Sequence, residues 1–283
     1  MTTRPNIQCS TGPFWAYSLE RAMDALAEAG FTDIELMVTR DPRTHSPEIP
    51  GRLAAERGLR IASIHGPFLV ITKTVWGIDP LEKIRRGAEM CRELGAPTMI
   101  VHPPYMWERA YARWVTRESE AFAEETGVTV AVETMYPAWV AGRRVRAYRW
   151  LDPKALLEAC PKVALDTSHV TVARGDILDA YEILAPKLTH IHLSDNARDG
   201  RDGHLELEQG KLPLDRFLKE LKKTGYTGAV SLELSVGRYI ERLDELVTML
   251  RRSKDYVERR LGTTERTAKG MPRKTTRKKE KTP

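Results

Sequence analysis

Short apolar runs alternate with amphipathic segments along most of the chain. The runs are rich in β-branched residues and have the length of buried strands, about four to eight residues. They cover 6–11, 33–38, 61–65, 98–102, 129–133, 163–166, 188–193 and 229–233. The amphipathic segments repeat apolar residues at the period of a helix. They cover 18–30, a stretch ending at Gly58, 79–95, a long stretch ending at Gly127, 152–160, 176–187, 214–225 and 240–261.

Capping signals support these helices. Asp79-Pro80 and Asp152-Pro153 each place an N-cap side chain before a proline whose backbone angle suits the first helical position. Alternating strands and helices imply a parallel sheet, and eight such units predict a closed (β/α)8 TIM barrel. No glycine-rich phosphate loop follows a strand, which disfavours an open dinucleotide-binding sheet.

Charge divides the chain into two parts. We expect a TIM-barrel catalytic domain over residues 1–262 and a basic tail over 263–283. The tail holds eight Lys/Arg and two acidic residues, which accounts for the whole formal net charge of +6 and leaves the barrel formally neutral. The tail has no apolar periodicity, so we expect it to be disordered. It would act as a solubilising extension or bind polyanions weakly.

Cysteine use and apolar patterning set the expected location. The three cysteines have no CxxC spacing, which argues against a disulfide framework and fits a reducing cytoplasm. No apolar run reaches the ~18 residues of a membrane span, and the first residues lack the apolar core of a secretory signal. We therefore expect a cytoplasmic protein with no membrane partner.

Metal-ligand side chains stand where the predicted strands end. They are Glu35, His65, His102, Glu133, Asp166, His192 and Glu233. In a parallel barrel the carboxyl ends of all strands converge on one mouth. An unpaired carboxylate after an apolar strand is costly to desolvate, so a cation nearby is expected. Glu133, Asp166, His192 and Glu233 come from the last four strands, and this ligand set suits Mn²⁺, Zn²⁺, Mg²⁺ or Co²⁺.

A second group of such residues lies beside the first. It contains His65, His102, His169, Asp202 and His204. These residues either complete additional metal sites or bind substrate hydroxyls, although a single histidine after a strand is more often structural. Four arginines after the fifth strand, Arg143, Arg144, Arg146 and Arg149, are either a solvated loop or a clamp for an anionic substrate.

The strand ends also carry recognisable motifs. They read SIHGPF, VHPP, AVETMYP, LDTSH, HIHLSDN, DGHLELEQG and LEL. With these motifs the chain, from residue 6 to about 261, resembles the xylose isomerase-like TIM-barrel superfamily. That superfamily includes sugar isomerases and epimerases and the type IV apurinic (AP) endonucleases. The HGPF, VHPPY and VETMYP segments are most similar to bacterial proteins described as sugar phosphate isomerase/epimerase.

The resemblance implies roles for individual residues. In sugar 3-epimerases one divalent metal is held by matches to Glu133, Asp166, His192 and Glu233, and the two glutamates exchange the substrate proton. A match to His169 and an arginine of the loop after the seventh strand bind the sugar, and Arg201 or Arg198 would be that arginine. In the endonucleases three zinc ions also use matches to His65, His102, Asp202 and His204. We count His65, His102, His169, Arg201 and Glu35 as candidate substrate-binding residues.

Two departures weigh against the endonuclease interpretation. The family loop usually reads His-x-x-x-Gly-Glu-Gly, whereas this chain has Glu208-Gln209-Gly210. A nuclease also needs an electropositive face for phosphates, and the barrel is formally neutral.

We therefore expect a metal-dependent isomerase or epimerase acting through an enediolate. Its substrate would be a small sugar, sugar phosphate or related polyol. A zinc-dependent AP endonuclease-like phosphodiesterase is the alternative, and a non-catalytic sugar-binding barrel is a further one. A homo-oligomer is compatible with the sequence, and binding of nucleic acid is not expected but is not excluded.

Overall fold

The computed structural model describes residues 4–140 and 143–262. The predicted tail, 263–283, lies outside the described residues, so its expected disorder stays a prediction. Eight parallel strands close into a barrel in the order β1-β2-β3-β4-β5-β8-β9-β10. They are β1 Asn6–Ser10, β2 Asp33–Met37, β3 Arg60–His65, β4 Thr98–Val101, β5 Thr129–Glu133, β8 Val163–Asp166, β9 Leu188–Leu193 and β10 Ala229–Leu232. The predicted TIM barrel is therefore confirmed.

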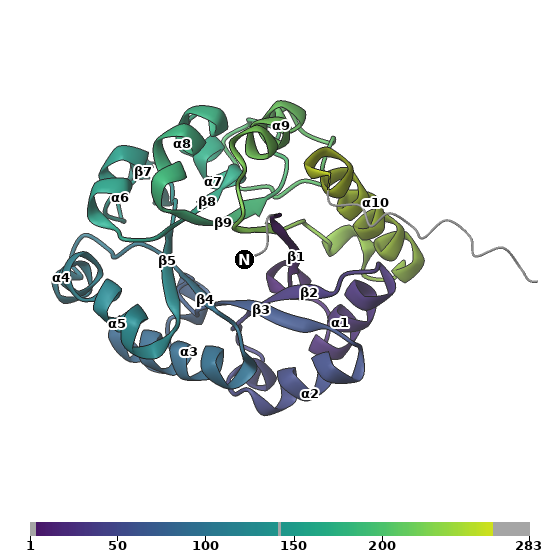
Figure 1. Cartoon of the computed structure of the whole chain (residues 1–283), viewed down its shortest axis with the longest axis horizontal. Coiled ribbons are helices and arrows are strands. Elements are labelled where there is room, and N and C mark those ends of the chain that lie inside the picture. The colour runs from purple at the N-terminus through teal and green to yellow at the C-terminus, as the bar shows by residue number, and fades with distance from the viewer. Residues whose placement is uncertain (1–3, 141–142, 263–283) are drawn as a thin grey trace, which may run out of the picture.

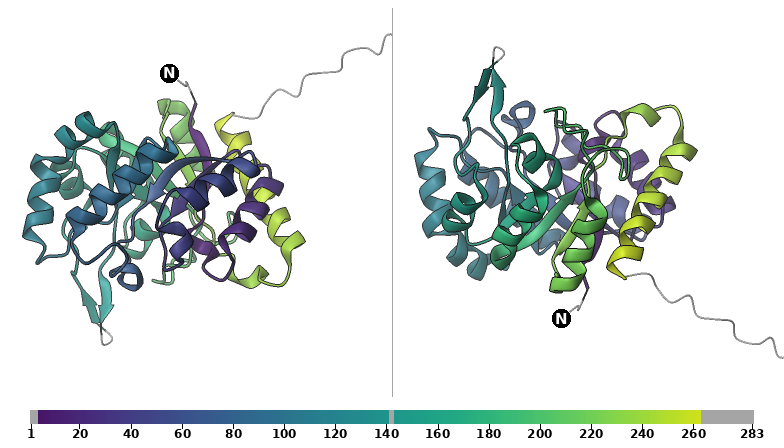
Figure 2. Two further views of the ribbon diagram at one scale, coloured as in Figure 1. Left: turned by 90° about the horizontal axis from the view of Figure 1, so that it is seen from below. Right: turned by 90° about the horizontal axis from the view of Figure 1, so that it is seen from above.

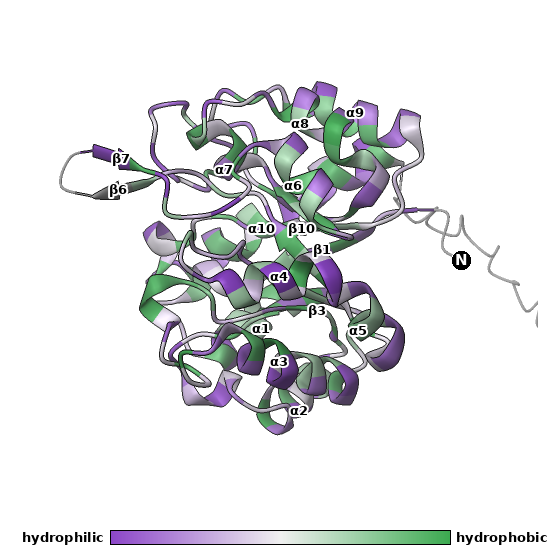
Figure 3. Cartoon of the chain, turned by 90° about the vertical axis from the view of Figure 1, so that its left-hand side faces the viewer, coloured by the Kyte–Doolittle hydropathy of each residue, from purple (hydrophilic) through white to green (hydrophobic). Residues whose placement is uncertain are grey.

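Helices surround the strands (Figure 1). They are α1 Leu19–Glu28, α2 Glu48–Glu56, α3 Pro80–Leu94, α4 Arg109–Arg117, α5 Ser119–Thr126, α6 Pro153–Ala159, α7 Thr167–Val172, α8 Ile177–Leu184, α9 Leu214–Thr224 and α10 Leu243–Leu261. Helix α9 shows why they pack on the sheet. Its buried residues Leu214, Phe217, Leu218 and Leu221 form one apolar stripe, and hydrophilic and hydrophobic residues alternate around it in Figure 3.

Four segments differ from the sequence prediction, and one of them is helix α7, which directly follows β8 where no helix was expected. The long helix expected to end at Gly127 is two helices, because Glu118 leaves the helical conformation (φ −122°) and Ser119 donates its hydroxyl to the carbonyl of Val115, a contact that distorts helices. The closing helix begins at Leu243, after a short 3-10 helix at Gly237–Tyr239. The irregular stretch after β5 contains an antiparallel hairpin, β6 Ala138–Val140 with β7 Arg143–Val145.

The hairpin marks the end of the barrel that holds the site. It projects from the end opposite the N-terminus, as both views of Figure 2 show. Because the chain enters β1 from the N-terminal side, the hairpin lies at the carboxyl ends of the strands, where TIM barrels place their active sites. Among the described residues, no helix has the length and apolar character needed to span a bilayer.

The inside of the barrel is much more polar than the space between sheet and helices. A large apolar core fills that space, whereas the separate apolar cluster of Ile100, Ala131 and Ala164 is small. Buried polar side chains also come from the strands, namely Gln8, Glu35, Ser63, His190 and Ser231. The barrel therefore presents hydrogen-bonding groups beneath its mouth.

Candidate metal centre

Four ligand-type side chains meet at the mouth of the barrel, and we call them the strand cluster: Glu133, Asp166, His192 and Glu233. One ligand atom of each lies within 4.8 Å of the others. The Nδ1 atom of His192 lies 2.6 Å from Oε1 of Glu133, 3.3 Å from Oε2 of Glu233 and 3.8 Å from Oδ2 of Asp166.

Strand register explains this convergence. Asp166 pairs with His192 across β8 and β9, and His192 pairs with Ser231 on β10. Glu233 follows Ser231 by two residues, so its side chain leaves the same face of the sheet. The cluster thus forms a row across β5, β8, β9 and β10, with a glutamate at each end.

The strand cluster holds more negative charge than its hydrogen bonds compensate. Burial and the nearby Glu133 charge raise the pKa of Asp166, despite the opposing histidines His169 and His204. Burial also raises the pKa of Glu233. Oδ2 of Asp166 is buried without a hydrogen-bond partner among the described residues. A divalent cation would compensate this charge, so the donor set fits one.

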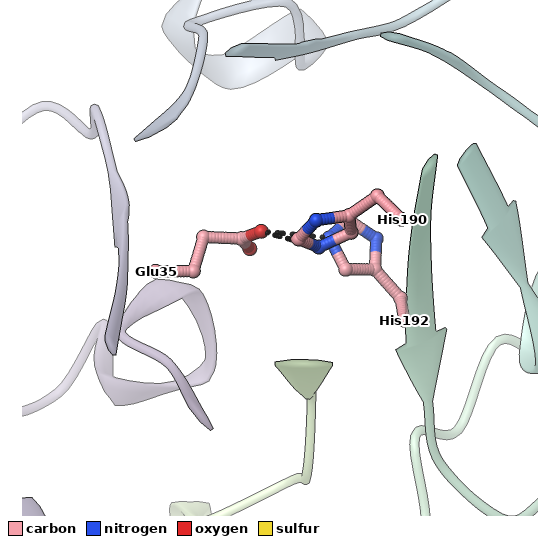
Figure 4. Close-up of side chains that lie close together, drawn as sticks. All are labelled: Glu35, His190 and His192. Atoms are coloured by element: carbon pink, nitrogen blue, oxygen red, sulfur yellow. Dashed lines mark hydrogen bonds and ion pairs between the residues drawn. The ribbon is translucent and has the colours of Figure 1, made fainter. Parts of the chain in front are cut away.

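Beneath the cluster, Glu35 contacts the far side of His192 (Figure 4). Oε2 of Glu35 lies 3.1 Å from Nε2 of His192 and 2.9 Å from Nε2 of His190, and Ser63 donates its hydroxyl to the same oxygen at 3.3 Å. An ionised carboxylate only accepts hydrogen bonds, so Glu35 keeps a proton on Nε2 of His192 and leaves Nδ1 turned to the strand cluster. Glu35 is fully buried and does not line the cleft described below.

His190 was not among the residues selected from the sequence. Its signal was present, because His190 and His192 stand two apart in one strand and must point to the same face. His190 does not stand at the end of its strand, because it lies one layer deeper in the barrel than His192.

His65 and His102 gather around the other oxygen of Glu133. Their Nε2 atoms each lie 3.4 Å from its Oε2. Nδ1 of His65 faces the carbonyl of Gly66 at 2.9 Å. Burial lowers the pKa of His102 to about 3, so its ring is neutral. Both rings line the cleft beside the strand cluster.

Three further predicted residues form what we call the rim cluster: His169, Asp202 and His204. Oδ1 of Asp202 accepts a hydrogen bond from Ser168 at 2.6 Å and lies 3.2 Å from Nε2 of His204. Its Oδ2 accepts a hydrogen bond from Tyr136 at 3.1 Å and lies 3.2 Å from Nε2 of His169. The rim cluster therefore satisfies its own carboxylate. Asp166, His169 and His204 also come together, because one ligand atom of each lies within 4.8 Å of the others.

His169 is oriented by two backbone contacts. The backbone N–H of His169 donates to Oδ1 of Asp166 at 2.7 Å, and this hydrogen bond caps helix α7. Its ring Nδ1 lies 2.9 Å from the carbonyl of Thr134 and so donates to it, because a carbonyl only accepts. Its other ring nitrogen, Nε2, lies against Asp202, so both ring nitrogens have partners.

The cleft above these groups has a volume of about 260 Å³. Glu133 and Glu233 line it, whereas Asp166 and His192 do not. Among the described residues, no arginine or lysine lines it. Arg201 is exposed and is not brought to the cleft.

Of the four arginines that follow β5, Arg143 is exposed and none of the four lines the cleft. Arg144 donates to the carbonyl of Val172, and Arg149 donates to the carbonyl of Met106. Arg146 lines a different cavity.

Comparisons with known proteins agree with this architecture. A family model described as a xylose isomerase-like TIM barrel matches residues 23–256. An uncharacterised protein of Mycobacterium tuberculosis is 30% identical over 252 residues, covering 82% of this chain and 90% of the relative. A D-psicose 3-epimerase of Enterocloster bolteae is 22% identical over 244 residues, 77% of each chain. The solved structure of a 3-keto-D-glucoside 4-epimerase from E. coli superposes with a TM-score of 0.64 at 16% identity, covering 90% of this chain and all (100%) of that one.

Proposed function

Because this chain belongs to the xylose isomerase-like TIM barrels, we propose that it is a metal-dependent isomerase or epimerase of a small, uncharged sugar or related polyol. The observation that carries the proposal is the strand cluster, in which three carboxylates crowd one histidine and Oδ2 of Asp166 has no hydrogen-bond partner among the described residues. Similarity to proteins named as D-psicose 3-epimerase and ketose 3-epimerase supports the reaction class.

Different members of the strand cluster take different roles. Glu133, Asp166, His192 and Glu233 would hold the divalent cation, which would stabilise the negative charge that develops on the substrate oxygens as an enediolate forms. Asp166 and His192 do not line the cleft, so they serve the metal alone. The two glutamates do line it and can touch the substrate.

The two glutamates are placed to exchange the substrate proton. They stand at opposite ends of the row of strands, on β5 and just after β10, so they approach a bound sugar from two sides. One removes the hydrogen next to the carbonyl and the other returns a proton to that carbon. Return from the second side inverts the centre, which is an epimerisation.

The lining of the cleft favours a neutral substrate. His65, His102 and His169 line the cleft, where their rings would contact sugar hydroxyls. Arginine and lysine are the usual side-chain donors to a phosphate, and none lines the cleft among the described residues. A sugar phosphate is therefore a poorer match than an unphosphorylated sugar.

Deuterium exchange tests the proposal. The metal-loaded protein should exchange solvent deuterium into at least one member of a panel of ketoses and keto-glycosides. Glu133→Gln and Glu233→Gln retain an oxygen ligand but lose the base, so exchange should fall by roughly 100-fold or more. Metal content, measured on the same samples, separates loss of the base from loss of the metal. Unchanged exchange in both variants contradicts the two-glutamate mechanism.

One observation favours a phosphodiesterase instead. The ligand atoms of Asp166, His169 and His204 could hold a further ion, and several metals suit phosphodiester cleavage. The lack of cationic side chains in the described cleft opposes this alternative. We expect no nicking of an abasic-site duplex at low salt with Zn²⁺, Mn²⁺ or Co²⁺. Efficient nicking that is lost in Glu133→Ala would replace the isomerase proposal. Metal binding without exchange into any substrate would instead favour a non-catalytic sugar-binding barrel.

A further inference from the structure

A second cavity of about 410 Å³ adjoins the metal cleft. We call its apolar lining the apolar annex, which consists of Phe14, Trp15, Tyr17, Leu19, Ala22, Met37, Leu69 and Ile71. The cavity lies between the segment that links β1 to α1, the end of β2, and the segment that follows β3. It therefore opens at the same end of the barrel as the metal cleft.

The two cavities share part of their walls. Gly12, Trp15, Met37 and Leu69 line both. A Cβ atom on Gly12 would lie 2.6 Å from Cε of Met37, so the glycine is what allows the Met37 side chain to lie there. The shared wall thus includes an unbranched thioether, which adapts its shape at low cost. The shared wall places the two cavities side by side, so one ligand can extend from the cleft towards the annex.

The annex has an exposed apolar entrance. Ile71 is 59% exposed and Trp15 is 77% exposed, and exposed apolar side chains beside a cavity are typical of ligand sites. Deeper in the cavity wall, the buried hydroxyl of Tyr17 has no hydrogen-bond partner among the described residues. The cleft above the strand cluster offers carboxylates and imidazoles, whereas its neighbour offers mainly hydrocarbon, together with a few polar residues: Thr11, Thr39, Thr44, Thr72, Arg40 and Asp41.

We propose that the apolar annex binds an apolar substituent of the substrate whose sugar part occupies the metal cleft. This inference rests on the proposed function. The substrate class is then a keto-sugar bonded to an aromatic or alkyl group, such as an aryl keto-glycoside, rather than a free ketose, because formation of the enediolate needs a carbonyl group in the sugar part. A free sugar would leave the annex filled with water against apolar walls, which gives no affinity.

Two glucosides that differ only in the substituent test the idea. Isothermal titration calorimetry of the metal-loaded protein compares methyl β-D-glucopyranoside with phenyl β-D-glucopyranoside. The phenyl compound should bind at least tenfold more tightly (about 1.4 kcal/mol) and with a more negative heat-capacity change, because apolar surface is buried.

Two neighbouring residues provide a matched pair of variants. Ile71 lines the annex, whereas Val70 is 67% exposed and does not line it. Ile71→Asp should abolish the preference for the phenyl compound, and Val70→Asp should retain it. Both positions are on the surface, so both variants should fold, and thermal unfolding checks this.

The outcomes separate the annex from the metal-dependent reaction. Equal affinity for the two glucosides, including no binding of either, overturns the annex even if deuterium exchange proceeds. A phenyl preference without any exchange retains the annex and rejects the isomerase. If the phenyl preference is absent and Ile71→Asp instead dissociates a dimer in size-exclusion chromatography, the annex is a contact between two copies of the chain, and the proposal is wrong.

Discussion

The strand cluster and the rim cluster contain the same kinds of side chain but differ in how their charges are compensated. In the rim cluster, both oxygens of Asp202 have two partners each, from Ser168, Tyr136, His169 and His204. In the strand cluster, Asp166 has a buried oxygen with no hydrogen-bond partner among the described residues. The two clusters share residue types but differ in the hydrogen bonding of their aspartates, and this difference supports the proposal of a metal at the strand cluster.

Backbone anchoring adds to the difference. The strand cluster stands on or directly after four paired strands, so its geometry is set before any ligand binds. In the rim cluster, Asp202 and His204 stand in the long segment between β9 and α9, and His204 has a backbone φ of +41°. We infer that the strand cluster is built to hold an ion and that the rim cluster is built to hold a loop over the cleft.

The largest expected effect compares one aspartate from each cluster. Asp166→Asn keeps an oxygen that can cap α7 but removes a charged ligand. Metal affinity should fall by more than the about 10- to 100-fold that loss of an outer partner causes. Asp202→Asn should change metal affinity by less than about fivefold relative to wild type. That change is smaller than the lower limit of about 10-fold for loss of an outer partner. Calorimetric titration with Mn²⁺ and elemental analysis of each variant measure this. Equal losses in the two variants, or three metals per wild-type chain, would remove the distinction between the clusters.

A smaller effect is expected from the residue beneath the strand cluster. Glu35→Gln removes the charge that orients His192, so metal affinity should drop by roughly 10- to 100-fold. Nitrogen NMR of the metal-loaded protein should show a weaker hydrogen bond from the protonated Nε2 of His192. Ser63→Ala is the control, because Ser63 contacts the same Glu35 oxygen without touching His192. Unchanged metal affinity in Glu35→Gln would show that the strand cluster orients His192 without help from Glu35.

The smallest effect concerns stability and pH in the rim cluster. Burial alone would lower the pKa of His204, but the carboxylates of Asp202, Asp166 and Glu233 outweigh it and raise the pKa from 6.5 to about 10. The folded state thus binds this proton more tightly than the unfolded state. Its stabilisation is complete below pH 6.5 and is lost as pH rises towards 10. Thermal unfolding of the metal-free protein measures this. Between pH 6.5 and about 10, the melting temperature should fall less steeply in His204→Asn than in wild type. Parallel declines would contradict a charged His204.

The fold was predictable from local patterns. The strand–helix units are recognisable in the sequence from β-branched runs, helical periodicity and capping residues such as Asp79 and Asp152. In the structure both aspartates accept hydrogen bonds from the first helical turn. The break at Glu118 was not predictable, because the sequence around it keeps helical periodicity while the local hydrogen bonding of Ser119 changes the backbone.

The convergence of the strand cluster also followed from sequence, because parallel strands of one barrel must end at one mouth. Its role as a metal centre stays a prediction. The placement of Glu35 against His192 did not follow, since β2 and β9 are separated in the barrel by β1 and β10 and their side chains meet only across its interior. Likewise, Arg201 was expected at the cleft, but the direction of a loop side chain depends on contacts that periodicity does not encode.

The sequence by itself determined the barrel and the set of side chains at its mouth, because strand alternation and strand ends are properties of neighbouring residues. Only the tertiary structure decided which carboxylates are left uncompensated, which histidine Glu35 orients, and that an apolar cavity adjoins the cleft above the strand cluster. These features depend on distances between segments far apart in the chain, and such distances are set by how the barrel closes and how its loops pack.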